Sequence, residues 1–382
     1  MKAFSQSRPV RASLALASAA AVSFAASFSA QAAPDWPMFR GDPSLSGVST
    51  AKVSTPLRLK WTFKTDGPVM SSPAIVGDRV YIGSGDSNVH CLNLADGKAR
   101  WTFTAGGPIE ASPLLLDGRL YIGDTLTNFY CLESKDGTVI WKRGFEDKVK
   151  SSATWYQPPG DKPKAVVVGS YDFKLYSFDA LTGSTNWVYE TGNYINGSAA
   201  VADGLTSFGG CDAVVHVLNL ADGTKNREIE AGAPIIGSAA LLNGRAYVGH
   251  YENEFLCVDL REGKVVWRYR DRAFPYTTSP AVTTDRVLFG GRDRRLHCVE
   301  RETGKSVWVH QTRGKVESSP VVAGDTVFFG SDDGRLYAVS LKDGSQLWQY
   351  EIGQPIQSSP AIVDGHVLIG SDDGSLYCFS AN

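Results

Sequence analysis

The stretch SSPVVAGDTVFFGSDDGRLYAVSLKDGSQLWQY, residues 318–350, decides the fold of this chain. Its apolar and β-branched runs cover 318–322, 326–329, 336–340 and 346–350, and turns rich in Asp and Gly separate them. Glycine adopts positive φ without a steric penalty, so Asp-Gly pairs suit tight hairpins. The stretch therefore predicts four antiparallel strands joined by short turns.

The same pattern recurs eight times along the chain. Its opening motif, Ser-Ser-Pro or a close variant, stands at 71–73, 111–113, 151–153, 197–199, 237–239, 278–280, 318–320 and 358–360. Six of the seven intervals are 40 or 41 residues long, and the interval from Ser151 to Gly197 is 46. A period of about 40 residues with Gly-rich turns is typical of a β-propeller, in which each repeat is one blade. We expect an all-β, eight-bladed β-propeller of four-stranded antiparallel blades over residues 57–382.

The two ends of the repeat array predict how the ring closes. The last repeat ends after its third strand, at Asn382, while the run 57–63 with Trp61 precedes the first Ser-Ser-Pro motif. Pairing the two would remove two exposed sheet edges. We therefore expect strand 57–63 to complete the C-terminal blade, with residues 33–56 as an N-terminal segment that leads into the propeller.

Residues 1–32 have the pattern of a secretory signal peptide. Positive residues precede a weakly apolar run at 12–28, and Ala30-Gln31-Ala32 forms a small-x-small cleavage site. The run is too short and too rich in Ser and Ala to span a membrane comfortably, and no other segment approaches that length. We expect an exported protein, periplasmic or secreted, without a membrane span. The first cysteine is Cys91, so we also expect no lipid anchor.

The charge balance limits the kinds of partner. Cleavage after Ala32 would leave 35 basic against 40 acidic residues. A nucleic-acid binder needs a basic footprint, so we expect no nucleic acid as partner. We expect a monomer whose partner is another envelope or extracellular protein.

A tryptophan follows the third turn of nearly every repeat. Counted with the isolated Trp61, the series is Trp61, Trp101, Trp141, Trp187, Trp267, Trp308 and Trp348. The fourth repeat departs from it, because Gly223 leads to Arg227. A residue repeated in every unit serves the unit, so we interpret these tryptophans as packing anchors between blades rather than as a binding ring.

Five of the six cysteines share one position in the third strand: Cys91, Cys131, Cys257, Cys298 and Cys378. Ser177, Val217 and Ala338 fill it in other repeats, which indicates a small buried site. Equivalent positions in neighbouring blades should lie beyond the roughly 7 Å Cα limit, so we expect no disulfide. Cys211 differs, because it falls in a turn.

The sequence predicts no metal site. Residues 331–334 and 371–374, both Ser-Asp-Asp-Gly, lack the ligand spacing of a calcium loop, and Asp and Gly are what a tight turn needs. The six histidines show no metal-ligand spacing.

The Ser-Ser-Pro motif, the Leu-Tyr third strand and the Gly-x-x-x-Trp turn together resemble the pyrroloquinoline-quinone-type (PQQ-like) propeller repeat. The segment Asp35–Gly41 also resembles the start of bacterial members. The resemblance covers nearly all of the predicted mature chain. It implies one of two branches: quinoprotein dehydrogenases, which bind quinone and calcium over the central channel, or non-enzymatic propellers, which include the lipoprotein that assists outer-membrane β-barrel assembly.

Absent motifs favour the non-enzymatic branch. The sequence has no Cys-Cys pair, no Cys-x-x-Cys-His motif and none of the long insertions that build a quinoprotein active site. The lipidated cysteine of the assembly lipoprotein is also missing. We expect a non-catalytic scaffold with no cofactor, and outer-membrane protein assembly is one role for it. The alternatives are a dehydrogenase that uses PQQ and calcium, and a carbohydrate-binding propeller.

Positions that vary between repeats are where a site can be built. The residue that opens each first strand reads Met70, Glu110, Lys150, Asn196, Ile236, Thr277, Glu317 and Gln357, with Tyr276 beside Thr277. We expect these side chains to line the channel mouth, together with Tyr171, Tyr251, Glu252, Arg292 and Arg294. The candidate binding residues are Glu110, Lys150, Asn196, Tyr276, Thr277, Glu317 and Gln357, and the alternative is a solvated funnel. The catalytic set is empty. On the opposite face, the long interval predicts an exposed loop at 154–164.

Overall fold

A computed structural model describes residues 1–4, 35–363 and 365–381. Most of the predicted signal peptide and its cleavage site lie outside the described residues. Residues 33–382 form one unit, which contains every strand of the described residues, and residues 1–32 form another. Within the described ranges, no helix is long and apolar enough to cross a membrane.

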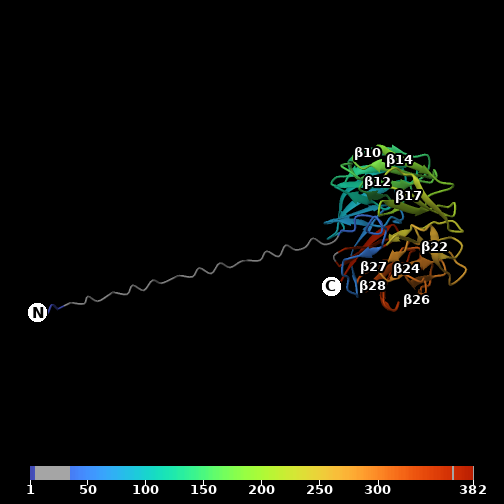
Figure 1. Cartoon of the computed structure of the whole chain (residues 1–382). Coiled ribbons are helices and arrows are strands. Elements are labelled where there is room, and N and C mark those ends of the chain that lie inside the picture. The colour runs from blue at the N-terminus through green and yellow to red at the C-terminus, as the bar shows by residue number, and fades with distance from the viewer. Residues whose placement is uncertain (5–34, 364, 382) are drawn as a thin grey trace. The chain divides into compact units, whose positions relative to one another are not determined.

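The strands form eight sheets arranged in a ring (Figure 1). Blades 1 to 4 consist of β3 (Ala74–Val76), β4 (Arg79–Gly83), β5 (Asn88–Asn93) and β6 (Ala99–Thr104); β7 (Leu114–Leu116), β8 (Arg119–Gly123), β9 (Asn128–Glu133) and β10 (Val139–Gly144); β11 (Thr154–Tyr156), β12 (Ala165–Gly169), β13 (Lys174–Asp179) and β14 (Thr185–Glu190); and β15 (Ala200–Ala202), β16 (Leu205–Gly209), β17 (Val214–Asn219) and β18 (Lys225–Glu230). Blades 5 to 7 consist of β19 (Ala240–Leu242), β20 (Arg245–Gly249), β21 (Phe255–Asp259) and β22 (Lys264–Tyr269); β23 (Ala281–Val282), β24 (Arg286–Gly291), β25 (Arg295–Glu300) and β26 (Ser306–Gln311); and β27 (Val321–Ala323), β28 (Thr326–Gly330), β29 (Arg335–Ser340) and β30 (Gln346–Glu351).

Blade 8 joins the two ends of the propeller. Its strands are β31 (Ala361–Val363), β32 (His366–Gly370), β33 (Ser375–Ser380) and β2 (Arg58–Lys64), and β2 pairs antiparallel with β33. Trp61 lies opposite Cys378, as each later tryptophan lies opposite the third-strand position of its own blade. The eight-bladed architecture and its closure by the N-terminal strand are therefore confirmed.

The tryptophans lie at the junctions between blades. The indole nitrogen of Trp308 donates to the carbonyl of Leu341 at 2.9 Å, and a Cβ on Gly344 would lie 2.5 Å from the Trp308 ring. Trp61, Trp101, Trp141, Trp187 and Trp267 make the same pair of contacts with the next blade. Each indole thus occupies the space that a side chain at the glycine position would need.

The opening motif is not part of the first strand, which corrects the expected strand 318–322: β27 begins only at Val321. The reason is that the second serine of each motif bonds to the next blade. The backbone N–H of Ser72 donates to Ser112 Oγ at 2.9 Å, and each serine does the same to its neighbour. The circle continues through Ser152, Ser198, Ser238, Ser279, Ser319 and Ser359 and returns to Ser72. These eight residues are called the serine ring below.

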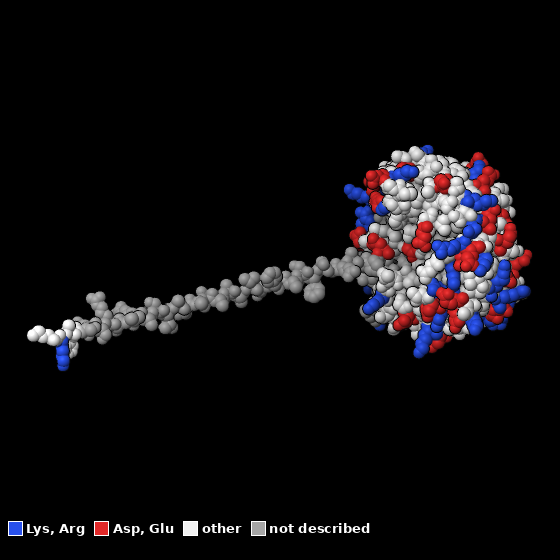
Figure 2. Space-filling view, in the orientation of Figure 1, with Lys and Arg blue, Asp and Glu red and all other residues white. Residues whose placement is uncertain are grey.

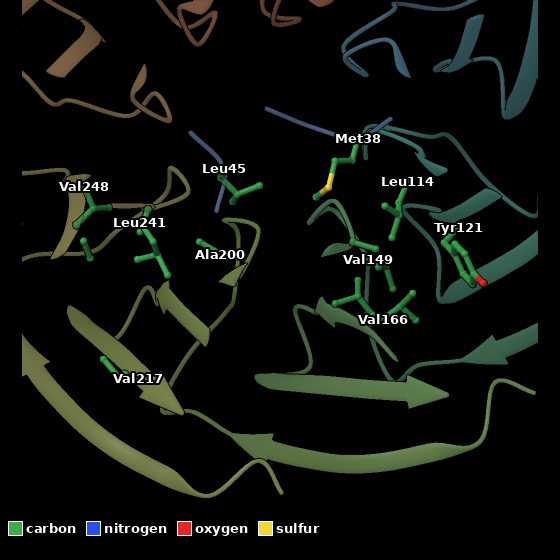
Figure 3. Packing of buried hydrophobic residues seen from close by; sticks show 14 of the residues in the cluster. Met38, Leu45, Leu114, Tyr121, Val149, Val166, Ala200, Val217, Leu241 and Val248 are labelled. Carbon is green, nitrogen blue, oxygen red and sulfur yellow. The ribbon is translucent and has the colours of Figure 1, made fainter. Parts of the chain in front are cut away.

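The N-terminal segment is hydrogen-bonded to most blades of the propeller. First strands in six blades donate a backbone N–H to its carbonyls, from Ile75 to Trp36 in blade 1 through to Val322 and Gly47 in blade 7. There β1 (Val48–Ser49) pairs parallel with β27. Figure 3 shows Met38 and Leu45 of this segment among core residues of several blades, including Leu114 and Leu241.

Arg40 is a buried charged residue of this segment. It is 1% exposed, and its Nη2 donates to the carbonyls of Pro280 and Pro320 at 2.8 and 2.6 Å. Burial lowers the pKa of its guanidinium to about 9. The arginine thereby connects two blades across the inner edge of the ring.

The long first turn of blade 3 is only partly the exposed loop that we expected. Thr154–Tyr156 is strand β11, and Tyr156 is buried with its hydroxyl bonded to Ser177. Only residues 159–163 form a continuous exposed loop. Tyr156 is buried because its ring fills space between blades 3 and 4, where it also accepts from the Trp187 indole at 3.1 Å.

Candidate binding site at the channel mouth

The residues that open the first strands meet at one end of the channel. Seven of them line a cavity of about 190 Å³: Met70, Glu110, Lys150, Asn196, Ile236, Thr277 and Gln357. The serine ring and Phe39 of the N-terminal segment line the same cavity. The structure thus gathers side chains from all parts of the propeller, although their role in binding stays a prediction.

On one side of the mouth, contacts run across blades 2 to 4. Lys150 Nζ lies 2.8 Å from Glu110 Oε2 and 5.8 Å from the centre of the Tyr171 ring. The Tyr171 hydroxyl donates to the side-chain oxygen of Asn196, whose Nδ2 lies 2.9 Å from the sulfur of Cys211. Both partners of the Lys150–Glu110 pair remain about one-third exposed, so they can also contact a ligand or partner.

The opposite side is organised around Glu317. Its Oε1 accepts from Arg292 Nε at 2.6 Å and its Oε2 from the Thr277 hydroxyl at 2.7 Å. Arg292 also donates to the hydroxyl of Tyr251 at 3.1 Å and lies over that ring. Glu317 is therefore held beside the cavity instead of lining it.

Asp332 and Asp372, which the sequence pattern assigns only to turns, are acidic residues beside the mouth. One carboxylate oxygen of each is buried without a hydrogen-bond partner among the described residues, and Gln357 donates to the other oxygen of Asp372 at 3.1 Å. Burial first, and the nearby Glu317 second, raise the pKa of Asp332 to about 6. The sequence did carry a signal for this placement, because both aspartates occupy the repeat position at which other blades have Tyr171 and Arg292.

Tyr276 was predicted to line the channel mouth, and this prediction is wrong. Its side chain is 1% exposed and packs against Tyr269, Phe289 and His297 in the core. The physical reason is its place in the repeat, where Val69 and Val316 are also fully buried. Tyr276 is an enlarged core residue and does not line the cavity.

The second aspartates of the Ser-Asp-Asp-Gly sequences hold their turns. Asp333 accepts the backbone N–H of Arg335 at 3.1 Å and the Tyr337 hydroxyl at 2.7 Å. Elsewhere, Asp271, Asp293 and His297 bring possible metal ligands within 4.8 Å of one another, a grouping that the sequence spacing did not indicate. The charge of Asp271 is already balanced by Arg295 at 2.7 Å.

The residues at the mouth do not fit pyrroloquinoline quinone. This quinone is a planar fused ring with three carboxylates, and a site for it needs cations and broad apolar faces. Among the described residues that line the cavity, Lys150 is the one cation, and it is paired with Glu110. The neighbouring Arg292 is paired with Glu317.

Comparison with known proteins places this geometry in a family. The family model described as outer membrane protein assembly factor BamB matches residues 58–125, 113–308 and 257–382. The chain has no significant match among curated proteins.

Among solved structures, BamB from Moraxella catarrhalis is 18% identical with a TM-score of 0.72, over 86% of this chain and 98% of that one. A europium-containing methanol dehydrogenase is 14% identical with a TM-score of 0.74, over 91% and 98%. The quinohemoprotein alcohol dehydrogenase from Comamonas testosteroni is 14% identical with a TM-score of 0.72, over 91% and 80%. These likenesses show the shared fold, and the family model goes further: the chain belongs to the PQQ-repeat propeller family of the outer membrane protein assembly factor BamB.

Proposed function

We propose that this protein is an exported, non-catalytic scaffold of the cell envelope that binds another protein through its channel mouth. Outer-membrane protein assembly is the process in which we place it. The observation that carries the proposal is the set of contacts between blades at the mouth, where Lys150–Glu110 and Arg292–Glu317 fix charged groups in a rigid rim. Such a rim presents a constant pattern of charge to a partner, and charge complementarity gives specificity.

Family membership and the predicted signal peptide support the envelope location. The paired charges support binding over catalysis, because a general acid or base needs a proton that it can exchange with a substrate. Figure 2 shows acidic and basic side chains interspersed over the visible face of the propeller, a surface that suits a mixed-charge protein partner.

The test is quantitative capture of envelope proteins on the purified mature chain. Lys150→Glu reverses the charge at the mouth beside Glu110. Lys135→Glu makes the same change in the exposed turn between β9 and β10, on the opposite face. A partner retained by wild type and by Lys135→Glu but lost with Lys150→Glu supports the proposal. A partner lost equally with both variants, or with neither, contradicts binding at the mouth.

The dehydrogenase alternative has its own assay. The protein is supplied with pyrroloquinoline quinone and calcium, and oxidation of alcohols and sugars is followed with an artificial electron acceptor. We expect no turnover. Turnover that Glu110→Gln abolishes would overturn the non-catalytic assignment.

A further inference from the structure

One junction between blades lacks the tryptophan that stands at each of the others. On either side of it, Trp187 donates to the carbonyl of Leu220 at 3.0 Å and Trp267 to that of Arg301 at 2.9 Å. Both indoles also cover a glycine of the next blade, Gly223 and Gly304. Between blades 4 and 5 the corresponding residue is Arg227, which is exposed.

A cavity of about 560 Å³ lies where that indole is missing. Its apolar lining includes the buried Leu241 and Leu260, which are 3% and 4% exposed. The polar and charged residues that line it are Asp203, Asn226, Arg227, Asn243, Asp259 and Arg261. This volume falls within the roughly 300–1,000 Å³ of small-molecule pockets. Arg227 covers Gly263 in place of an indole, since its Cδ, Nε and Nη1 lie 3.0, 3.6 and 3.9 Å from where a Cβ of Gly263 would be, and the cavity lies beside it.

Two polar groups at this cavity can bind a ligand: the Leu260 carbonyl and the Arg227 guanidinium. Leu260 stands three residues before Gly263, as Leu220 stands before Gly223, so its carbonyl is the acceptor that an indole N–H uses elsewhere. Within the described residues, no side chain donates to this carbonyl, and no hydrogen bond or ion pair engages the Arg227 guanidinium. A guanidinium over an aromatic face attracts the ring.

A second pocket lies on the other side of the hairpin formed by β15 and β16, which also lines the first cavity. It measures about 380 Å³ and is lined mainly by apolar residues that include Pro43, Trp155, Pro159 and Val201. Ala202 and Leu205 of the hairpin line the first cavity, while Val201 and Gly204 line the second. A polypeptide that inserts one side chain in the first cavity can therefore place an apolar neighbour in the second.

We propose that the cavity between blades 4 and 5 receives a tryptophan side chain of a partner polypeptide. The indole lies against Leu241 and Leu260, donates its N–H to the Leu260 carbonyl and lies under the Arg227 guanidinium. The incoming ring supplies the hydrogen bond to the next blade that six of the chain's own tryptophans make at their junctions. This site is separate from the channel mouth and does not depend on the function proposed there.

The test uses N-acetyl-tryptophanamide as the probe and NMR titration of the mature protein as the measurement. We expect saturable binding that shifts the amides of β19 and β21. Arg227→Trp fills the cavity with the chain's own indole and should weaken binding at least tenfold. Arg58→Trp, at an exposed arginine in β2, is the matched control and should bind as wild type does. Absence of saturable binding, or equal binding by Arg227→Trp, would overturn the proposal.

Two further titrations separate the occupants and guard against a misfolded variant. Arg227→Ala leaves the cavity open and removes the guanidinium together with its methylene groups, so binding should weaken about three- to tenfold. N-acetyl-phenylalaninamide lacks the ring N–H and should bind more weakly than the tryptophan probe. Free L-tryptophan that binds tenfold more tightly than the capped form would indicate a free amino acid as ligand and contradict the partner proposal.

Discussion

At the residue scale, the same turn position has opposite consequences in different blades. Trp308 covers Gly344, whose φ of +72° and lack of a Cβ make room for the ring. Arg227 stands at the equivalent position in blade 4 but leaves a cavity of about 560 Å³. The repeat predicted the anchors, and the deviation at Arg227 was visible in the sequence. The cavity itself was not, because an arginine side chain can cover a neighbour with its methylene groups or leave it open.

Truncating the two residues should have unequal effects on stability. Trp308→Ala removes a buried indole and its hydrogen bond to Leu341, so we expect a loss of about 3–5 kcal/mol in the free energy of unfolding. Arg227→Ala removes an exposed side chain and should cost less than about 1 kcal/mol. Urea denaturation of both variants measures the difference. Equal losses would refute the interpretation of the tryptophans as packing anchors.

Asp332 should make stability depend on pH. Folding raises the pKa of this carboxyl from 3.8 to about 6, so the folded state holds the proton more tightly than the unfolded state. Its contribution is therefore fully present below about pH 4 and is lost as the pH rises through about 6. Asp332→Asn should gain about 1 kcal/mol relative to wild type between pH 4 and pH 7.5, a value reduced for partial exposure. Urea denaturation at both pH values is the measurement, and a difference that does not change with pH would contradict it.

At the scale of elements, the opening motif has a role that strand patterns do not reveal. The periodicity predicted the blades, and the first strand of each blade begins directly after its motif. The periodicity wrongly extended the first strand of blade 7 into Ser318 and Ser319. There, the backbone N–H of Ser319 donates to the hydroxyl of Ser359 in the next blade. A hydrogen bond between residues 40 positions apart cannot be read from local preference.

Breaking one link of the serine ring should destabilise the whole propeller. Ser112→Ala leaves the backbone N–H of Ser72 buried without its acceptor, so we expect a loss of about 1–3 kcal/mol in the free energy of unfolding. Ser184→Ala, at an exposed turn in blade 3, is the control and should change it by less than about 0.5 kcal/mol. Thermal or urea denaturation distinguishes them. A Ser112→Ala variant as stable as the control would show that the ring contributes nothing measurable.

At the scale of the whole molecule, the N-terminal segment and the strand β2 that follows it have different tasks. β2 completes blade 8, and the residues before it follow the inner edges of the other blades. The sequence predicted the first task, since an unpaired fourth strand and a blade without one were both visible. The second was missed, because residues 35–49 have neither a repeat nor a strand pattern.

Removing that segment should destabilise the ring while leaving its closure intact. A chain that begins at residue 50 keeps β2 but loses Met38, Leu45 and the carbonyls that accept N–H groups from first strands. We expect a lower midpoint in thermal unfolding and faster amide exchange at Ile75 and Leu241, whose N–H groups bond to the segment. Unchanged exchange at these two amides would show that the segment is dispensable.

The sequence by itself determined the number of blades, their strands and the closure of the ring, because these follow from a period that recurs and from turns that glycine permits. Only the tertiary structure decided what fills the centre and the junctions. Tyr276 packs in the core, Asp332 and Asp372 each bury one carboxylate oxygen, and the N-terminal segment accepts hydrogen bonds from the first strands of six blades. Each of these outcomes depends on the space and the unpaired backbone groups that neighbouring blades leave, and such groups exist only once the ring has formed.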